Sequence, residues 1–287
     1  MKVLITAINS FVGNSLGAYL ARQGHEVSGT IRRARLGRTH IPYAGKLFAF
    51  DLGEPFSGRM LDDIDILVHT ANDFSAGAGE RNVTGTIALS QAAKSRGFSR
   101  QIFISSYSAN QAARTEYGQT KFVLERFFRT NGGVCVRPGL VLGRGSVFWR
   151  IVRVIKLLPV IAVLDGGVGK LPIVGIKELN EALGKIITLD RPRTLYNLFD
   201  EDLVTLRELI DAIVKILGKK RLLIPVSSEM LIKPLQVFNR LGISLPIDVN
   251  NVRAFVVNQG TQYPSDLGDL LQEKAPSFRD TLKVVLL

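Results

Sequence analysis

The first half of the chain alternates short apolar runs with stretches in which apolar residues recur at helical spacing. The strand-like runs cover 2–6, 26–31, 46–50, 65–70, 101–106 and 133–137, and the first of them is rich in β-branched residues. Helical spacing is found over 12–23, 80–96 and 116–129. Strands that alternate with helices usually form a parallel sheet with helices on both faces. The pattern therefore predicts an α/β fold.

The second half of the chain is less regular. One amphipathic stretch covers 146–158, and residues 194–198 have the pattern of a late strand. Thr205 and Glu208 form a capping-box pair that predicts a helix running to about residue 217. We expect the remaining residues, 222–287, to be mostly helix and loop.

The domain organisation follows from this change of pattern. We expect residues 1–140 to form one domain, whose sheet is completed by the late strand near 194–198. Residues 141–287 then form most of a smaller C-terminal lobe.

The stretch 146–158 combines an apolar helical face with three cations, Arg150, Arg153 and Lys156, and with Trp149. We favour packing of the apolar face on the C-terminal lobe, which is the commonest fate of such a helix. Peripheral attachment to an anionic membrane is the alternative. The predicted apolar face consists of Val147, Phe148, Ile151, Val154, Ile155 and Leu158.

Composition narrows the classes of function. The formal net charge is +12, but the cations are dispersed and accompany no aromatic patch or DNA-reading motif, so no nucleic-acid partner is expected. Attraction to an anionic nucleotide or membrane explains the charge equally well. The lone cysteine, Cys135, lies in an apolar strand and is expected to pack in the core. It excludes an internal disulfide and a multi-cysteine zinc site, and no metal is expected.

The sequence shows no signal-peptide pattern and no apolar run long enough to cross a bilayer. We therefore expect a cytoplasmic location.

The turn after the first strand reads Thr6-Ala7-Ile8-Asn9-Ser10-Phe11-Val12-Gly13. A strand, a tight turn and a helix start form an anion site, because free N–H groups and the helix dipole point at a phosphate. Only one of three possible glycines, Gly13, is present. A purely structural turn is therefore the alternative interpretation.

A second candidate site involves Tyr117 and Lys121, which share a helix face at i and i+4. A neighbouring ammonium stabilises a phenolate and is expected to lower the pKa of the tyrosine. Ser106 ends the preceding strand, at the edge of the sheet where such folds bind ligands. The three side chains could surround one carbonyl. A solvated helix face and a turn-forming serine are the alternative interpretations.

Over about residues 1–215 the sequence resembles the extended and atypical short-chain dehydrogenases/reductases, of the NAD-dependent epimerase/dehydratase type. The resemblance rests on motifs that occur in the family's order. These are the turn from Thr6 to Gly13, Asp51-Leu52, His69-Thr70-Ala71, Asn82-Val-Thr-Gly-Thr86, Ser106 with Tyr117 and Lys121, Arg137-Pro138-Gly139, Tyr196-Asn-Leu and Thr205-Leu-Arg-Glu208.

The sequence departs from the family's pattern at three places. Ala7 and Ser10 replace two glycines, and the interval from Ser106 to Tyr117 is shorter than in sugar-nucleotide epimerases. Ile176-Lys177-Glu178 replaces the usual Val-Asp-Asp. These departures leave the tightness of cofactor binding and the substrate open.

The resemblance implies a Rossmann-type, doubly wound parallel sheet with a smaller C-terminal substrate-binding lobe. It implies that Ser106, Tyr117 and Lys121 are catalytic. The implied cofactor-binding residues are Ala7, Ser10, Phe11, Val12, Gly13, Arg32, Arg33, Asp51, Leu52, Thr70, Ala71, Tyr117, Lys121, Pro138 and Gly139.

The end of the second strand bears on the choice of cofactor. It reads Thr30-Ile31-Arg32-Arg33 and offers no acid for a free ribose 2′-hydroxyl. Because a 2′-phosphate requires a cation, we expect NADP(H) to be favoured, with NAD(H) possible. The alternative is a solvated basic loop.

The leading functional hypothesis is an NAD(P)-dependent oxidoreductase or epimerase that acts on a carbonyl or secondary alcohol. By resemblance, its substrate is a nucleotide-linked sugar and its reaction that of a 4-ketoreductase or 4-epimerase. The alternative is a non-catalytic dinucleotide-binding protein with a structural or redox-sensing role. The helix over 116–129 could help to form a homodimer, but core packing explains its apolar residues equally well.

Overall fold

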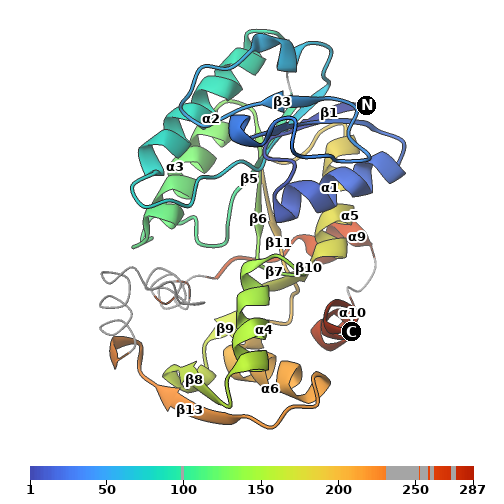
Figure 1. Ribbon diagram of the computed structural model, residues 1–287. Helices are drawn as coiled ribbons and strands as arrows, with labels where there is room; N and C mark the ends of the chain where they lie inside the picture. The colour runs from blue at the N-terminus through green and yellow to red at the C-terminus, as the bar shows by residue number, and fades with distance from the viewer. Residues whose placement is uncertain (98–99, 231–251, 253–257, 259–261, 273–275) are drawn as a thin grey trace. The chain divides into compact units, whose positions relative to one another are not determined.

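The computed structural model describes residues 1–97, 100–230, 252, 258, 262–272 and 276–287 (Figure 1). The chain forms two compact units, and each contains segments that are distant in the sequence. Unit 1 consists of Met1–Gln111, Glu116–Arg137 and Asn180–Tyr196. Unit 2 consists of Ala112–Thr115, Pro138–Leu179 and Asn197–Leu287.

A seven-stranded sheet forms the centre of unit 1, and the strands from β6 to β3 pair in parallel. Their apolar, β-branched sequences suit burial on both faces. The predicted α/β fold with a Rossmann-type parallel sheet is confirmed. In spatial order the strands are β11 (Leu195–Leu198), β6 (Val134–Pro138), β5 (Arg100–Ile104), β4 (Ile66–His69), β1 (Lys2–Ile5), β2 (Glu26–Ile31) and β3 (Leu47–Ala49).

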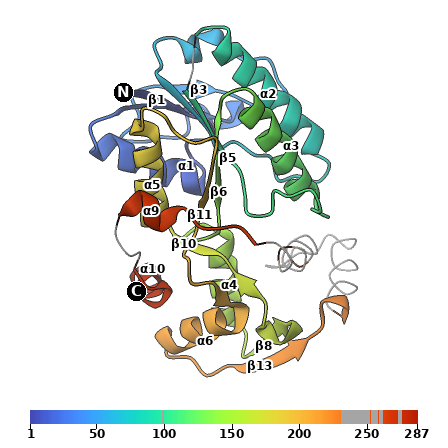
Figure 2. The same cartoon turned by 180° about the vertical axis from the view of Figure 1, so that it is seen from behind.

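Helices cover both faces of this sheet. Figures 1 and 2 show α2 (Gly79–Lys94) and α3 (Glu116–Thr130) on one face, with α1 (Phe11–Arg22) and α5 (Ile176–Thr188) on the other. The core beneath α3 includes Phe103, Phe128 and Cys135. Cys135 is fully buried, as expected, and burial raises the pKa of its thiol.

Unit 2 has its own apolar core. Phe148, Val152 and Ile155 of α4 (Val147–Leu157) pack there with residues of α6 (Leu206–Ile216) and α10 (Phe278–Leu286). The predicted capping box opens α6: the Thr205 hydroxyl accepts from the Glu208 N–H, and the Glu208 carboxylate accepts from the Thr205 N–H.

The buried face of α4 differs from the predicted face. Val147 and Leu158 were expected to be buried but are exposed, whereas Val152, outside the predicted set, is fully buried. Because Phe148, Val152 and Ile155 are spaced at i, i+4 and i+7, they form one stripe. The position of the helix against the core, rather than its composition, selects that stripe.

Short strand pairs complete unit 2. The expectation of helix and loop from residue 222 onward is wrong for β13 (Leu222–Val226), which pairs in parallel with β8 (Val160–Leu164). This partner lies some sixty residues away, so local pattern does not reveal the pairing. The other pairs are β7 (Leu140–Leu142) with β10 (Ile173–Gly175) and β9 (Lys170–Leu171) with β12 (Val204–Thr205).

Further along the chain, α9 (Leu267–Leu271) and α10 agree with the helical expectation. Residues 231–251, 253–257, 259–261 and 273–275 lie outside the described residues. Among the helices that are described, none has the length and apolarity of a membrane span.

Candidate active site

The turn between β1 and α1 is held by contacts to the neighbouring strand. The Ala7 N–H donates to the Thr30 Oγ1 (3.1 Å). Ile8 is buried against Gly29, where an added Cβ would lie only 2.4 Å from the Ile8 side chain. Ala7 has φ +47°, in the left-handed region that favours glycine. The backbone therefore retains a glycine-type turn although the first glycine is absent.

Gly13 occupies the tightest point of this turn. A Cβ on Gly13 would lie 2.7 Å from the Ala7 carbonyl oxygen and 3.1 Å from the Thr70 Oγ1. The Ser10 hydroxyl caps α1 by accepting from the Gly13 N–H (3.2 Å). Ser10 therefore takes up one of the N–H groups that a glycine would leave open.

Two N–H groups of the first helical turn stay available. Among the described residues, the N–H groups of Phe11 and Val12 have no hydrogen-bond partner. Free N–H groups at a helix N-terminus attract phosphate. The turn thus fits a phosphate-bearing group such as a dinucleotide, with fewer donors than a turn with all three glycines would offer.

We expect Ala7→Gly to raise the free energy of unfolding by about 0.5–1 kcal/mol, because glycine adopts positive φ without strain. Urea denaturation of the purified chain measures this. Ala18→Gly is the matched control, because Ala18 lies inside α1 and the same change there should lower stability by about 1 kcal/mol. A loss of stability in Ala7→Gly would contradict the strain argument.

Thr6 links the ends of β1 and β4. Its Oγ1 accepts from the N–H groups of Thr70 (2.9 Å) and Ala71 (3.0 Å). Nearby, α2 approaches the Asp51-Leu52 segment closely, because a Cβ on Gly85 would lie about 3.0 Å from Leu52 backbone atoms. The structure thus places Thr70 and Ala71 beside the turn, and Leu52 against α2.

Arg32, Arg33 and Asp51 lie together where β2 and β3 end. The Arg33 N–H donates to the Asp51 carboxylate (3.1 Å), and the Arg33 guanidinium donates to the Pro55 carbonyl (3.3 Å). The Arg32 guanidinium is 62% exposed and lies 3.6 Å from the Asp73 carboxylate. Both arginines are exposed, and Arg32 makes only this one weak ion pair.

The structure brings the proposed catalytic trio together at the end of β5. The side chains of Ser106 and Tyr117 share a hydrogen bond. The Lys121 Nζ donates to the Ile104 carbonyl (2.9 Å) and lies 5.7 Å from the centre of the Tyr117 ring. The Ser108 N–H donates to the Ser106 Oγ (3.2 Å). The Ser106 hydroxyl can thus accept from the backbone and donate its own proton.

Burial controls the protonation of the trio. It lowers the pKa of Lys121 to about 8 and raises the pKa of Tyr117, which the hydrogen bond to Ser106 partly offsets. The expectation that Lys121 lowers the pKa of Tyr117 is therefore wrong for this structure. The reason is desolvation, which disfavours the phenolate. Tyr117 carries its proton at neutral pH.

Pro138 and Gly139 belong to unit 2. The Gly139 N–H donates to the Leu198 carbonyl (3.1 Å), and a Cβ on Gly139 would lie 2.5 Å from the Pro172 carbonyl oxygen. The glycine is needed for this close approach of two backbones.

Residues 3–151, more than half of the chain, match the sequence model of the NAD dependent epimerase/dehydratase family. The chain belongs to this family. The match confirms the resemblance drawn from the ordered motifs, and it includes the turn at Gly13 and the trio of Ser106, Tyr117 and Lys121. None of the curated protein sequences is a significant match to this family member.

Solved structures show the same fold at low sequence identity. A nucleoside-diphosphate-sugar epimerase from Staphylococcus aureus superposes with a TM-score of 0.74 at 15% identity, over 99% of this chain and 100% of that one. UDP-glucose 4-epimerase from Thermus thermophilus, in complex with NAD, gives a TM-score of 0.67 at 18% identity, over 100% and 98% of the two chains.

Phe74 is a site residue that the sequence patterns did not indicate. Its ring stacks on Tyr117, with centroids 5.8 Å apart and an angle of 26° between planes, and Phe74 is 79% exposed. An aromatic residue in a loop carries no periodic signal, so only the structure shows it beside Tyr117.

A buried ion pair lies behind the trio. The Arg137 guanidinium donates twice to the Glu125 carboxylate (2.7 and 2.5 Å), and the Ser105 hydroxyl donates to it as well (3.0 Å). Glu125 lies one turn after Lys121 on α3. The i+4 spacing from Lys121 places Glu125 on the same face of α3, and this was the signal that the sequence offered. Its partner, Arg137 on β6, is a tertiary contact that the spacing does not reveal. The pair links α3 to β5 and β6 next to the site.

Proposed function

We propose that the chain is an NAD(P)-dependent enzyme acting on a carbonyl or secondary alcohol of a nucleotide-linked sugar, as a 4-ketoreductase or 4-epimerase. The observation that carries this proposal is the hydrogen-bonded pair of Ser106 and Tyr117 beside the buried Lys121, at the carboxyl end of the sheet. Family membership supports an enzyme. The substrate class is supported by folds such as that of the Staphylococcus aureus nucleoside-diphosphate-sugar epimerase.

Each member of the trio has a distinct task in this proposal. Tyr117 gives its hydroxyl proton to the substrate oxygen during reduction and becomes a phenolate, and in the oxidation direction the phenolate takes the proton of the substrate hydroxyl. The Ser106 hydroxyl donates a hydrogen bond to the same oxygen. The ammonium of Lys121 holds a ribose hydroxyl of the cofactor and so positions the dinucleotide beside Tyr117.

The bound nicotinamide dinucleotide supplies the hydride acceptor and donor. The residues proposed to hold it are those of the turn, with the free N–H groups of Phe11 and Val12 toward the phosphates. We propose that Asp51 and Leu52 contact the adenosine end of the dinucleotide. The rest of the dinucleotide is proposed to contact Thr70, Ala71, Pro138 and Gly139.

The proposal is tested with a panel of UDP-, dTDP- and GDP-linked sugars and 4-keto sugars. A ketoreductase oxidises NADPH or NADH with one of them, whereas an epimerase converts a sugar without net consumption of cofactor. Absorbance of the reduced cofactor detects the first reaction, and chromatography of the sugars detects the second. Turnover that is lost in Ser106→Ala supports the proposal.

A non-catalytic dinucleotide-binding role is the second candidate. It is favoured by Ser10, whose hydroxyl occupies the Gly13 N–H that a phosphate would otherwise meet. Binding of NADPH or NADH with no turnover of any panel member would support this role over the enzyme.

We expect NADPH to bind more tightly than NADH, with Arg32 on the 2′-phosphate. A charged hydrogen bond is worth about 1.5–3 kcal/mol, which outweighs the weak exposed ion pair with Asp73. Arg32→Ala should therefore lower NADPH affinity by about tenfold or more while sparing NADH. Fluorescence titration measures both affinities.

Arg38→Ala serves as the control for this titration, because Arg38 is an exposed cation in the same segment after β2. It should leave the ratio of the two affinities unchanged. Equal affinities in the wild type, or tighter binding of NADH, would count against the assignment of NADP(H).

A further inference from the structure

The pair of strands β8 and β13 in unit 2 is apolar on both of its faces. Leu222 lies opposite Val160, and Ile224 lies opposite Ala162. All four residues are exposed, while the alternate residue Ile161 is buried in the core of unit 2. A sheet with one solvated face normally carries polar residues on it. These four residues, here called the β8–β13 face, break that rule.

The apolar surface continues to the end of α4. Leu157 is 76% exposed, and Leu158 is exposed beside it. The Leu222 N–H donates to the Pro159 carbonyl (3.0 Å), which joins the start of β13 to the segment that follows α4. Single exposed apolar side chains are ordinary, but a contiguous group indicates an interaction surface.

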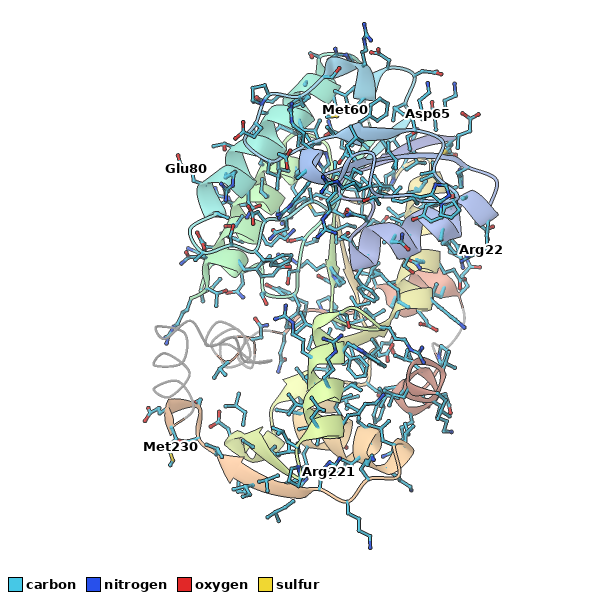
Figure 3. All side chains as sticks on the ribbon, in the orientation of Figure 1. Arg22, Met60, Asp65, Glu80, Arg221 and Met230 are labelled. Carbon is cyan, nitrogen blue, oxygen red and sulfur yellow. The ribbon has the colours of Figure 1, made fainter. Side chains whose placement is uncertain are left out.

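Cations without acidic partners adjoin this apolar surface where β13 begins and α4 ends. The Arg221 guanidinium donates to the carbonyls of Ile155 (2.7 Å) and Lys156 (3.0 Å), which places it at the end of α4 (Figure 3). Lys219 and Lys220 precede it and are exposed.

Acidic residues are missing from both segments that form this surface. Residues 144–164 and 212–228 contain no Asp or Glu. Among the described residues, Arg150, Arg153, Lys156, Lys219, Lys220 and Arg221 form no ion pair. Their charge is therefore not neutralised within the described part of the chain.

We propose that the β8–β13 face, with Leu157, Leu158 and the adjoining cations, docks on an anionic phospholipid membrane. A bilayer surface matches both features of this surface. Its apolar interior accepts the leucine and isoleucine side chains, and its anionic headgroups attract the lysines and arginines. A second copy of the chain does not fit, because a symmetric contact would bring like charges together. This inference goes beyond the proposed function and does not depend on it.

The inserting residues differ from those that the sequence pattern of 146–158 indicates. Phe148, Val152 and Ile155 face the core of unit 2 and are fully buried. Membrane contact therefore falls to Leu157 at the end of the helix, to Leu158 and to the β8–β13 face. The helix itself contributes three exposed cations, Arg150, Arg153 and Lys156.

Vesicle sedimentation of the full chain tests the proposal. With phosphatidylcholine vesicles containing one quarter phosphatidylglycerol the chain should pellet, whereas with pure phosphatidylcholine it should stay in the supernatant. Each cation near an anionic surface contributes about a fivefold gain in binding constant, so Lys219→Glu/Lys220→Glu should lower the partition coefficient at least about 25-fold. Leu222→Ser/Ile224→Ser should also release the chain from anionic vesicles.

Lys46→Glu/Lys94→Glu is the matched control, because it makes the same change of net charge at exposed cations of unit 1. It should reduce pelleting much less than the Lys219/Lys220 pair. Circular dichroism and thermal unfolding confirm that the variants are folded, which is expected because all substituted side chains are exposed.

Four results would overturn the proposal. The first two concern the wild-type protein: it stays in the supernatant with anionic vesicles at low salt, or it pellets equally with both vesicle types. The third is an equal loss of pelleting in the Lys46/Lys94 control and in the Lys219/Lys220 variant. The fourth is unchanged pelleting of Leu222→Ser/Ile224→Ser. Sedimentation-velocity detection of a dimer that the leucine and isoleucine substitutions dissociate would instead assign the surface to a second copy.

Discussion

Tyr117→Phe should lower kcat by about 10²–10⁴-fold, the range that a positioned general acid or base contributes, while dinucleotide affinity stays nearly unchanged. The substitution removes only the hydroxyl that shares a hydrogen bond with Ser106. It keeps an aromatic ring for the stack with Phe74. This one variant therefore tests proton transfer by Tyr117 separately from binding of the cofactor.

Steady-state kinetics on a substrate from the nucleotide-sugar panel measures the effect, with fluorescence titration of the reduced cofactor beside it. Tyr19→Phe is the matched control, because Tyr19 lies on α1 and faces Gly184 of α5 rather than the trio. It should leave kcat unchanged. Lys121→Ala should impair both turnover and cofactor binding, since its ammonium serves both.

Full activity of Tyr117→Phe on a true substrate would eliminate the proposed role of the tyrosine. Equal loss of cofactor binding in Tyr117→Phe would also contradict it, because the phenol would then be a binding group rather than a proton donor.

Glu125→Gln should cost about 3–5 kcal/mol of the free energy of unfolding, because it leaves the buried guanidinium of Arg137 without its counter-charge. The side chain of Glu125 is 1% exposed and that of Arg137 is 7% exposed. Desolvation of an unpaired charge at this depth is the source of the cost. Urea denaturation at neutral pH measures it.

Two further variants distinguish charge from packing. Replacing both partners with apolar side chains, in Glu125→Leu/Arg137→Met, should cost much less than Glu125→Gln, because no charge is then left buried and alone. Glu181→Gln is the exposed control. Its partner Lys185 lies 3.4 Å away on the same helix, and the loss should stay below about 0.5 kcal/mol. A loss in Glu125→Gln as small as that of the control would disprove the role given to the buried pair.

Local chemistry made much of unit 1 predictable, together with one helix start in unit 2. Strand β1 and helix α1 follow from runs and spacings within a few residues of each other, and so does the capping box at Thr205 and Glu208 of unit 2. The motif order along the chain was enough to identify the family. It also placed Ser106, Tyr117 and Lys121 in one site, because the carboxyl ends of parallel strands and the helices that follow them lie at the same edge of a sheet.

Burial was decided only by the tertiary structure. The pattern at Tyr117 and Lys121 suggested an acidic phenol, but the pKa of Tyr117 is raised because the surrounding side chains desolvate it. Likewise, the pattern of 146–158 showed an amphipathic helix, but the core of unit 2 selects Val152 and leaves Val147 exposed. Desolvation depends on which segments pack together, and spacing along one segment does not contain that information.

By itself, then, the sequence determined the main elements of unit 1, the parallel sheet and the identity of the family, because these depend on neighbours in the chain and on their order. The tertiary structure decided which distant groups meet. It paired β13 with β8, set Glu125 against Arg137 and stacked Phe74 on Tyr117. Such contacts join residues that lie 12 to 62 positions apart, and they form because folding buries apolar and charged groups together.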